Sequence, residues 1–327
     1  MIHFFITKRH RYTCNGFIES WAREFRSQFR LVPYERCPWR KSLPNGACIF
    51  TDLERLLPDE KRLAAQLADA LRPHPERYSI LNEPGHYLGR FDLQRKLHEQ
   101  GINEFRVWRV NELPDDLKFP VFLRSDLDHR GPLTPLLHSH QELDSVLKQN
   151  RFKRRFLQKH LMAIEYCYCG DTNGILRKFS AMNIAGTLIP RHILFSANWI
   201  TKKPDLVTEA FVREEVEFIA NFPHVDELRK VFQLAGVDYG RIDYGVRHGR
   251  IQVWEINTNP IIVPPREKID PRRLPAQSRS ARQIAEALEL LSHRHGSGEA
   301  FPFRTPEFFK HKLIQIFSRA LRFRKRK

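Results

Sequence analysis

The sequence predicts an α/β domain followed by an α+β domain with a mainly antiparallel sheet, and three observations support this division. Strand-like and helix-like stretches alternate up to a polar turn near residue 115, as in a largely parallel, Rossmann-like sheet. Beyond that turn, strand-like stretches mostly follow one another directly, which favours antiparallel pairing. A Gly- and Pro-containing linker then leads to a basic tail. The predicted divisions are 1–115, 116–295 and 296–327.

The elements of the first domain are taken from hydrophobic periodicity. Its predicted strands are "IHFFIT", "GACIFTD", "YSILNE" and "FRVWRV". Its predicted helices are "FIESWAREFRSQFR", "DEKRLAAQLADAL" and "RFDLQRKLHEQ". Because the helices separate the strands, we expect βαβ connections in this domain.

The second domain begins with the strand "PVFLRS". Ser139 and Glu142 form a predicted capping box that opens the helix "SHQELDSVLKQ". Further strands are expected in "RFLQKHL", "IEYCYCG", "ILRKFSAMNIAGTLIPRHILF" and the hairpin of residues 240–260. Helices are expected in "TEAFVREEVEFIANF", "HVDELRKVFQLAG" and "SARQIAEALELLSHRH".

Bulk composition indicates a soluble globular protein of two or three domains, with 327 residues of which 41% are hydrophobic. No apolar run is long enough to cross a bilayer, and "MIHFFITKRHRYTC" is charged too early for a secretion signal, so we expect a cytoplasmic protein. The odd number of cysteines and the absence of CxxC predict reduced thiols. Cys167 and Cys169 in "CYC" are interpreted as core thiols rather than as a soft-metal site.

The hairpin "GRIDYGVRHGRIQVWEINTNP" carries carboxylates on apolar strands. If 247–249 forms a three-residue loop, Asp243 faces Val253 and Arg241 faces Glu255. A two-residue loop would place Asp243 behind the sheet.

Four polar side chains then share one face of the hairpin, because strand side chains alternate. They are Arg241, Asp243, Glu255 and Asn257, and the opposite, buried face holds Ile242, Val253, Trp254 and Ile256. Asp243, Glu255 and Asn257 offer oxygen ligands that suit Mg²⁺ better than zinc, and Mg²⁺ bound by few carboxylates usually also binds phosphate. Alternatively, the strands form a solvated hairpin with a cross-strand ion pair of Arg241 and Glu255.

These strands resemble the metal-binding strands of the ATP-grasp superfamily. In that pattern one Asp, here Asp243, and a following Glu-x-Asn, here Glu255 and Asn257, hold two Mg²⁺ ions. Arg241 matches an arginine that such enzymes use on the transferring phosphate or its acyl product. The resemblance implies ATP and two Mg²⁺ as cofactors.

The resemblance extends more weakly over residues 85 to 290 and implies further nucleotide contacts. Arg90 in "GRFDLQRKLHEQGI" and Arg124 in "FPVFLRS" take the positions of two phosphate-contacting basic residues that are lysines in the family. Arginine can also clamp phosphate. The segment that binds adenine is expected at Gln158, Lys159 and Leu161, and Glu165 is expected to hold the ribose. The lid after Arg124, at 125–132, has one glycine where the family has several.

Two more residues are proposed as site residues. Arg191 lies on a predicted antiparallel strand and is expected to meet an anionic substrate or the γ-phosphate. Asn259, just beyond the metal strand, is expected to contact the acceptor substrate, or else to cap a turn.

The net charge of +17 is concentrated toward one end. From Arg304 to Lys327 nine Lys or Arg stand against Glu307 alone. Residues 306–327 have apolar positions at helical spacing with basic residues opposite, which predicts a basic amphipathic helix. Such a helix would either lie on an anionic membrane as a peripheral anchor or dock on the protein's own core. Nucleic-acid binding is not favoured, because no recognition module accompanies the charge.

The resemblance implies a Mg²⁺-dependent ligase that activates a carboxylate as an acyl phosphate for attack by an amine. The first alternative is a kinase that phosphorylates a hydroxyl group. The second is a basic membrane- or RNA-binding protein with a degenerate nucleotide site. The identities of the carboxylate and amine substrates do not follow from the sequence.

Overall fold

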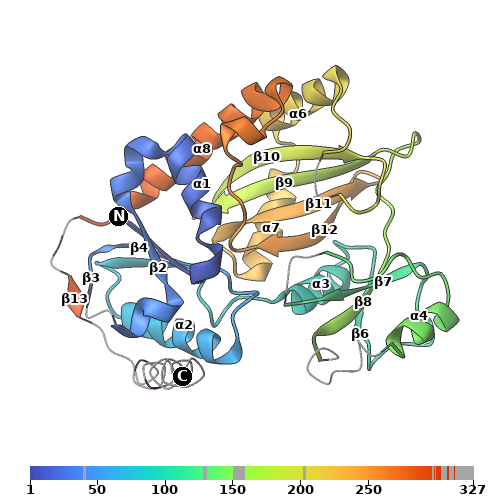
Figure 1. The fold of residues 1–327 in the computed structure, drawn as a ribbon, viewed down its shortest axis with the longest axis horizontal. Helices are drawn as coiled ribbons and strands as arrows, with labels where there is room; N and C mark the ends of the chain where they lie inside the picture. The colour runs from blue at the N-terminus through green and yellow to red at the C-terminus, as the bar shows by residue number, and fades with distance from the viewer. Residues whose placement is uncertain are drawn as a thin grey trace, which may run out of the picture.

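The fold comes from a computed structural model that describes residues 1–39, 42–127, 131–149, 159–201, 204–296, 298, 300–302, 308 and 313. The strands form three main sheets, which come from three successive parts of the chain, and helices lie beside these sheets (Figure 1).

The first sheet is parallel, as the alternation of strands and helices predicts. Its order is β2-β1-β4-β5, with β1 (Ile2–Ile6), β2 (Phe29–Pro33), β4 (Gly46–Phe50) and β5 (Tyr78–Leu81). The helices α1 (Tyr12–Trp21) and α2 (Pro58–Leu71) belong to this part. Strands β1 and β4 are buried throughout, which explains their nearly continuous apolar sequences.

The helix predicted over "FIESWAREFRSQFR" is wrong in its extent. Helix α1 ends at Trp21, a 3₁₀ segment (Arg23–Gln28) follows, and Phe29 already begins β2. Strand β2 has three half-buried residues and two buried ones, so its hydrophobic pattern is weak. The apolar residues of α1 and of the short strand β2 together fit one helical period, and the sequence therefore predicted a single helix.

The second sheet has the order β6-β8-β7, with β6 (Val107–Arg109), β7 (Val121–Ser125) and β8 (Leu161–Glu165) pairing antiparallel. Strand β6, predicted within the first domain, therefore pairs beyond residue 115. Helices α3 (Arg90–Glu99) and α4 (His140–Leu147) belong to this region. The Ser139 side chain accepts from Glu142 N, but Glu142 itself accepts from His138 N, so the capping box is only half formed.

The third sheet is antiparallel, with the order β10-β9-β11-β12. Its strands are β9 (Leu176–Ile184), β10 (Thr187–Ser196), β11 (Tyr239–Arg247) and β12 (Arg250–Asn257). Helices α6 (Glu209–Asn221), α7 (Val225–Ala235) and α8 (Leu274–Ser292) flank it (Figure 1). A small pair of strands, β3 (Ser42–Leu43) and β13 (Phe301–Pro302), completes the described strands.

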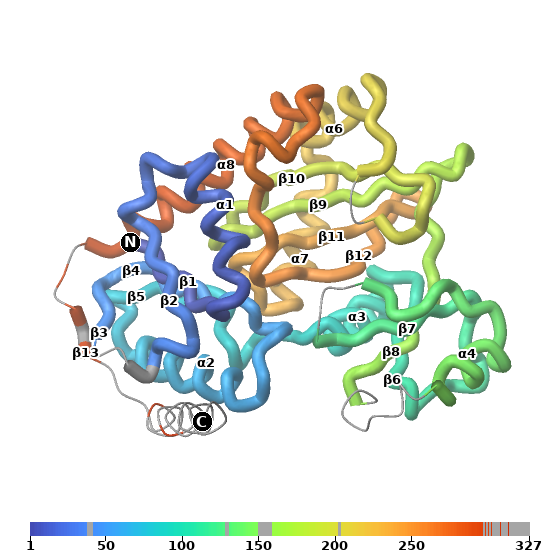
Figure 2. Tube along the Cα trace, viewed as in Figure 1, coloured from blue at the N-terminus to red at the C-terminus, as the bar shows by residue number. Residues whose placement is uncertain are grey.

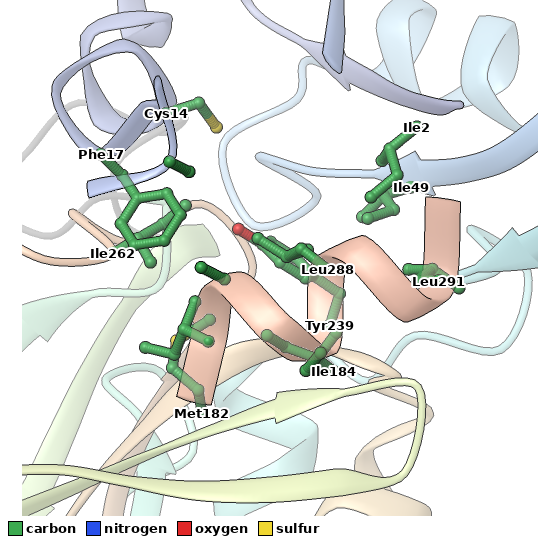
Figure 3. Packing of buried hydrophobic residues seen from close by; sticks show 14 of the residues in the cluster. Ile2, Cys14, Phe17, Ile49, Met182, Ile184, Tyr239, Ile262, Leu288 and Leu291 are labelled. Atoms are coloured by element: carbon green, nitrogen blue, oxygen red, sulfur yellow. The ribbon is translucent and has the colours of Figure 1, made fainter. Parts of the chain in front are cut away.

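One hydrophobic cluster joins the first sheet to the third through α8. Ile2 and Ile49 of the first sheet, Met182 and Tyr239 of the third, and Leu288 of α8 are all part of it (Figure 3). Helix α8 follows the third sheet in sequence, yet it runs back toward the chain's first strands (Figure 2). The two sheets therefore share a core.

Asn82 adds a polar connection between the same two sheets. It directly follows β5, is fully buried and has a positive φ of 57°. Its side-chain amide donates to the carbonyls of Phe50 (3.0 Å) and Tyr239 (2.6 Å), and its side-chain oxygen accepts from the amides of Asp238 and Tyr239 at 2.8 Å. Asn tolerates the left-handed conformation better than most residues.

None of the helices in the described part of the chain is both long and apolar enough to span a membrane. The predicted amphipathic helix of 306–327 lies outside the described residues, apart from Phe308 and Leu313. Phe308 is buried in a cluster that also contains Leu63 and Leu67 of α2, whereas Leu313 is exposed.

Candidate active site

The hairpin β11–β12 turns through two residues rather than the predicted three. Arg247 pairs with Arg250, and His248 and Gly249 both have positive φ, 49° and 74°. Two successive left-handed residues form the type I′ turn that matches the twist of a hairpin. The three-residue loop was therefore wrong, and so was the pairing that it predicted for Asp243.

An irregularity in the pairing of β11 with β12 returns Asp243 to the face that was predicted for it. Tyr244 pairs with Val253, but Asp243 pairs with Glu255, so Trp254 is an extra residue on β12. A bulge of this kind shifts the alternation by one residue. Asp243 and Glu255 are thus direct cross-strand neighbours, and Arg241 pairs with Asn257. The four polar residues share a face as predicted, but because of a two-residue turn and a bulge rather than a three-residue loop.

The opposite face is apolar, with one correction. Ile242, Val253 and Ile256 pack in a cluster with residues of α3 and α7. Trp254 instead packs beside Ile164 and Cys167, on the side of the second sheet. The bulge therefore moves Trp254 from the predicted buried face to the face of the carboxylates.

Asp243 is surrounded by donors and positive charge. Ser180 Oγ donates to it at 2.6 Å, Arg241 Nε at 3.0 Å and Lys178 Nζ at 3.3 Å. Burial alone would raise the pKa of Asp243, but Arg241, Lys178 and the Ser180 hydroxyl hold it below its usual range. Asp243 is consequently a carboxylate, as a metal ligand must be.

Glu255 meets the two arginines that the resemblance assigned to phosphate. Arg90 donates to Glu255 Oε2 at 2.8 Å, and Arg124 forms an ion pair with the same oxygen. Arg90 begins α3 and also donates to the carbonyl of Ser125, at 3.1 Å, whereas Arg124 lies on β7. The fold therefore brings Arg90 and Arg124 from two distant segments to one metal-ligand candidate.

Asn257 and Asn259 lie at the end of β12, where the first sheet approaches. Asn257 is 8% exposed, and its side-chain oxygen accepts from the amide of Asn259 at 2.9 Å. The Asn259 side chain donates to Asp52 at 2.9 Å and accepts from Thr13 at 2.6 Å. Asn259 thus connects the hairpin to helix α1 and to the loop after β4 in the first domain. An acceptor contact by Asn259 remains a prediction, since its side chain already bonds within the protein.

A pocket opens beside the two carboxylates, between the second and third sheets. Its charged part includes Arg124, Lys178, Asp243 and Glu255. Its remaining walls are largely apolar and aromatic, formed by Gln94, Phe105, Phe122, Gly131, Pro132, Ile164, Glu165, Tyr166, Cys167, Leu176, Trp199, Ile200, Thr201 and Trp254. Trp199 lies between Phe122 and Tyr166, with ring centroids 5.2 Å and 5.7 Å away. One pocket therefore combines aromatic surfaces with paired carboxylates and cations.

Comparison with solved structures finds this arrangement of sheets in other chains. A D-alanine–D-alanine ligase from Bacillus anthracis, complexed with ATP, is 16% identical with a TM-score of 0.50, and the match covers 90% of this chain and 96% of that one. The ATP-grasp ligase PsnB, complexed with a minimal precursor, is 11% identical with a TM-score of 0.50, covering 89% and 99%. No protein-family model and no curated protein matches the sequence.

The chain has the ATP-grasp fold. In this fold the second and third sheets form two lobes on either side of the pocket. The chain crosses from one lobe to the other between β8, which ends at Glu165, and β9, which begins at Leu176.

Residues 158–161, where the resemblance implies the segment between the lobes, lie before the crossing, and an adenine contact there remains a prediction. Leu161 begins β8, the central strand of its sheet, and its carbonyl accepts from Val110 N at 3.4 Å. Lys159 is exposed and is not a wall of the pocket, and Gln158 lies outside the described residues. The predicted strand "IEYCYCG" ends at Glu165, so Tyr166 and Cys167 form the pocket wall at the crossing.

Glu165 lines the pocket, but its carboxylate is already engaged. Arg106 Nε donates to Glu165 Oε1 at 2.8 Å, and the backbone amides of Lys118 and Arg106 donate to its two oxygens. These bonds hold together three segments of the second sheet. The ribose contact expected for Glu165 remains a prediction.

Arg191 lies away from the pocket walls. It is 1% exposed, and its Nε donates to the carbonyl of Ile262 at 2.6 Å while the guanidinium also contacts Gln277 of α8. Burial, and then the charge of Arg241, lower the pKa of Arg191 to about 9. Arg191 therefore forms a buried connection between β10 and α8. This geometry does not favour the direct contact with substrate that was predicted for Arg191.

Several residues beside the carboxylates or in the pocket wall are not among the predicted site residues. Lys178 and Ser180 alternate on β9 beside Asp243, and a strand-period reading of "LRKFS" would have placed them on one face. Trp199 follows β10 in a loop, and Trp254 depends on the bulge, so neither has a local sequence signal.

The donor set fits a hard divalent cation. Two carboxylates and one amide oxygen suit Mg²⁺. Within the described residues no group of three or more His, Cys, Asp or Glu side chains is placed to hold a metal ion, so the candidate set depends on the Asn257 amide beside two carboxylates. The cations around these ligands suit phosphate, and the aromatic walls suit a planar base.

Proposed function

We propose that the protein is a Mg²⁺-dependent ligase that uses ATP to activate a carboxylate as an acyl phosphate, which an amine then attacks. The supporting observation is the cross-strand pair Asp243–Glu255, bracketed by Lys178, Arg241, Arg90 and Arg124 at one end of an aromatic pocket. The solved ATP-grasp ligases with the same fold agree with this reading.

In this proposal Asp243, Glu255 and Asn257 would hold two Mg²⁺ ions. Bound Mg²⁺ would neutralise phosphate charge in the transition state of phosphoryl transfer. Arg90 and Arg124 would release Glu255 and bind phosphate oxygens, and Lys178 and Arg241 would do so beside Asp243. Arg241 would also steady the acyl phosphate, so the protein's contribution is positioning and charge neutralisation.

Nucleotide binding is tested through the fluorescence of Trp199 and Trp254. We expect MgATP to change the emission, and Glu255→Gln to weaken MgATP binding by roughly tenfold or more, because a metal ligand loses its charge. The matched control is Glu214→Gln, whose carboxylate pairs with Arg177 outside the pocket walls. Equal affinities for the wild type and Glu255→Gln would refute the metal assignment.

The reaction is tested by ADP release from the full chain with pools of amino acids and cell extract, with Glu255→Gln beside it. A product whose mass equals the two substrates less water is an amide and supports the ligase. A product carrying an added phosphate would identify a kinase. MgATP binding without turnover in any pool would favour a degenerate nucleotide site.

We further propose that the basic tail binds anionic membranes, and that the protein is otherwise cytoplasmic. The support is the charge of residues 304–327, since each Lys or Arg near an anionic surface contributes about 1 kcal/mol. We expect the full chain to sediment with phosphatidylglycerol vesicles in low salt. A chain ending at residue 313, which keeps the buried Phe308, should not. Equal sedimentation of both chains would contradict the proposal.

A further inference from the structure

The crossing between the lobes carries two thiols that the proposed reaction does not use. Cys167 lines the pocket together with Glu165 and Trp254, and Cys169 lies two residues further along the chain. Cys169 Sγ lies 3.6 Å from the carbonyl oxygen of Cys167, so both thiols lie on the same short stretch of chain beside the pocket. Two cysteines separated by one residue can be joined by a disulfide when the backbone between them adjusts.

The surroundings of Cys167 favour its thiolate. Arg247 Nη1 lies 3.5 Å from Cys167 Sγ and favours the thiolate, whereas the Cys167 thiol donates to Gln252 Oε1 at 3.7 Å, which favours the protonated form. Arg247 also pairs with Glu104 at 3.4 Å, which opposes part of its effect. The contact with Cys169, and then Arg247, lower the pKa of Cys167 to about 7 against the effect of burial. The thiolate is the reactive form of cysteine.

The position of Cys169 depends on a glycine in β11. A Cβ atom at Gly245 would lie 3.0 Å from Cys169 Cβ and 3.1 Å from its Sγ. The chain at Cys169 therefore packs directly on the strand that carries Asp243. The contact with Cys167, and then burial, raise the pKa of Cys169, so Cys169 is held as the neutral thiol of the pair.

The other three cysteines are internal controls. Cys14, Cys37 and Cys48 are at most 1% exposed, and none of them lines the pocket. Burial raises the pKa of Cys14 to about 12 and also raises that of Cys48. A small oxidant that enters the pocket should therefore distinguish Cys167 from these three thiols.

We propose that Cys167 is a peroxide-reactive thiol and that it forms a disulfide with Cys169 that lowers the affinity of the pocket for nucleotide. The Cys167 sulfur attacks one oxygen of hydrogen peroxide, the O–O bond breaks, and water leaves with a sulfenic acid on Cys167. The Cys169 sulfur then attacks Cys167 Sγ, its proton leaves with the hydroxyl group as water, and the S–S bond forms. Two thiols are oxidised and one peroxide is reduced to two waters.

The disulfide acts on the pocket because the same residues form its wall. Pulling Cys167 toward Cys169 removes its sulfur from Arg247 and moves the wall between Glu165 and Leu176. Residues i and i+2 of an extended chain have Cα atoms near the upper limit for a disulfide, so the bond should be strained and easily reduced. The switch is therefore reversible.

The first experiment treats the full chain with hydrogen peroxide and maps the disulfide by peptide mass. We expect loss of two hydrogens at 167–169, reversed by dithiothreitol, with Cys14, Cys37 and Cys48 still reduced. Cys169→Ala should accumulate a sulfenic acid at Cys167 that dimedone traps, and Cys167→Ala should not react in this segment. Arg247→Gln should slow the reaction relative to Arg247→Lys. Oxidation that leaves 167–169 reduced would overturn the proposal.

The second experiment measures binding of MgATP before and after oxidation. This regulatory step rests on the proposed nucleotide site. We expect a roughly tenfold or larger loss of affinity on oxidation, restored by dithiothreitol and absent in Cys169→Ala. A disulfide that leaves MgATP affinity unchanged would overturn the switch. Failure of the reduced chain to bind MgATP would refute the nucleotide site, while the peptide masses would still decide the reactivity of Cys167.

Discussion

At the scale of single residues, the two carboxylates of the candidate site are already paired with cations of the protein itself. Glu255 is bound by Arg90 and Arg124, and Asp243 by Lys178 and Arg241. A Mg²⁺ ion that arrives alone must compete with cations already in contact with its ligands. Phosphate can remove that competition, because it offers those cations another anionic partner.

Mg²⁺ and ATP should therefore bind much more tightly together than separately. We expect little change in tryptophan emission with Mg²⁺ alone, weak binding of ATP in chelator, and a saturable change with both. The measurement is a fluorescence titration in each ion condition. Saturable Mg²⁺ binding that is equally tight without nucleotide would contradict the proposed exchange of partners.

A second residue-scale prediction concerns His3 in the core of the first sheet. His3 is fully buried, its Nε2–H donates to the carbonyl of Pro44 at 2.9 Å, and burial lowers its pKa to about 4. Below the usual histidine pKa of about 6.5, His3 is protonated in the unfolded chain but stays neutral in the folded chain until the pH approaches 4. Stability is therefore intact above that value and is lost as pH falls toward 4.

The expected loss from this residue is about 2 to 3 kcal/mol between pH 7.5 and pH 4.5. It is measured as the free energy of unfolding in urea at both pH values. His3→Phe should reduce the pH dependence, whereas His138→Phe, at an exposed position, should not. The same slope in His3→Phe as in the wild type would contradict the assignment.

At the scale of elements, pattern and spacing predicted most helices and strands but not the irregular backbone. Amphipathic helices such as α2 and α7 have a strong period and were placed well. The break between α1 and β2 was missed because the apolar residues on both sides fit one helical period. The bulge at Trp254 was missed because an inserted residue changes the facing of a strand without changing its composition.

The site was predictable to the extent that its residues lie on one hairpin. Asp243, Glu255 and Asn257 follow from alternation along two strands and from the resemblance that they carry. The pocket wall at the crossing depends on where β8 ends, and strand ends leave weak signals in the sequence. Trp199 enters from a separate loop, so only the tertiary fold brings it to Phe122 and Tyr166.

The end of β8 also supplies the third prediction. Glu165→Ala should lower the free energy of unfolding by about 2 to 4 kcal/mol, because Arg106 and two backbone amides lose a buried partner. Glu214→Ala, which removes a more exposed ion pair with Arg177, should cost less than about 1 kcal/mol. Urea unfolding checks both. Unchanged stability with weakened MgATP binding would instead support the predicted ribose contact.

At the scale of the whole molecule, the first sheet and the third sheet are not independent. They share a hydrophobic cluster with α8 (Figure 3). In addition, Asp52 of the first domain accepts a hydrogen bond from Asn259, directly after β12. The first domain therefore braces the site from one side. The orientation of the first domain relative to the third sheet is set by hydrophobic packing and by a small number of buried hydrogen bonds.

Asn82 provides the test of this bracing. Asn82→Ala removes bonds to Phe50, Asp238 and Tyr239 and places alanine at a φ of 57°. We expect the free energy of unfolding to fall by about 3 kcal/mol or more, from unsatisfied backbone groups and the left-handed conformation. Asn198→Ala, in an exposed loop, is the control, and urea unfolding is the measurement. Equal stabilities of the two variants would contradict the bracing role.

The position of α8 has a consequence for how the chain is made. The strands at residues 2–6 and 46–50 leave the ribosome early, yet part of the surface that covers them belongs to residues 274–292. During most of synthesis the nascent first sheet must therefore expose apolar area that α8 covers in the folded protein. Pausing or truncation before residue 274 should thus leave a chain prone to chaperone capture, even though its first domain is completely translated.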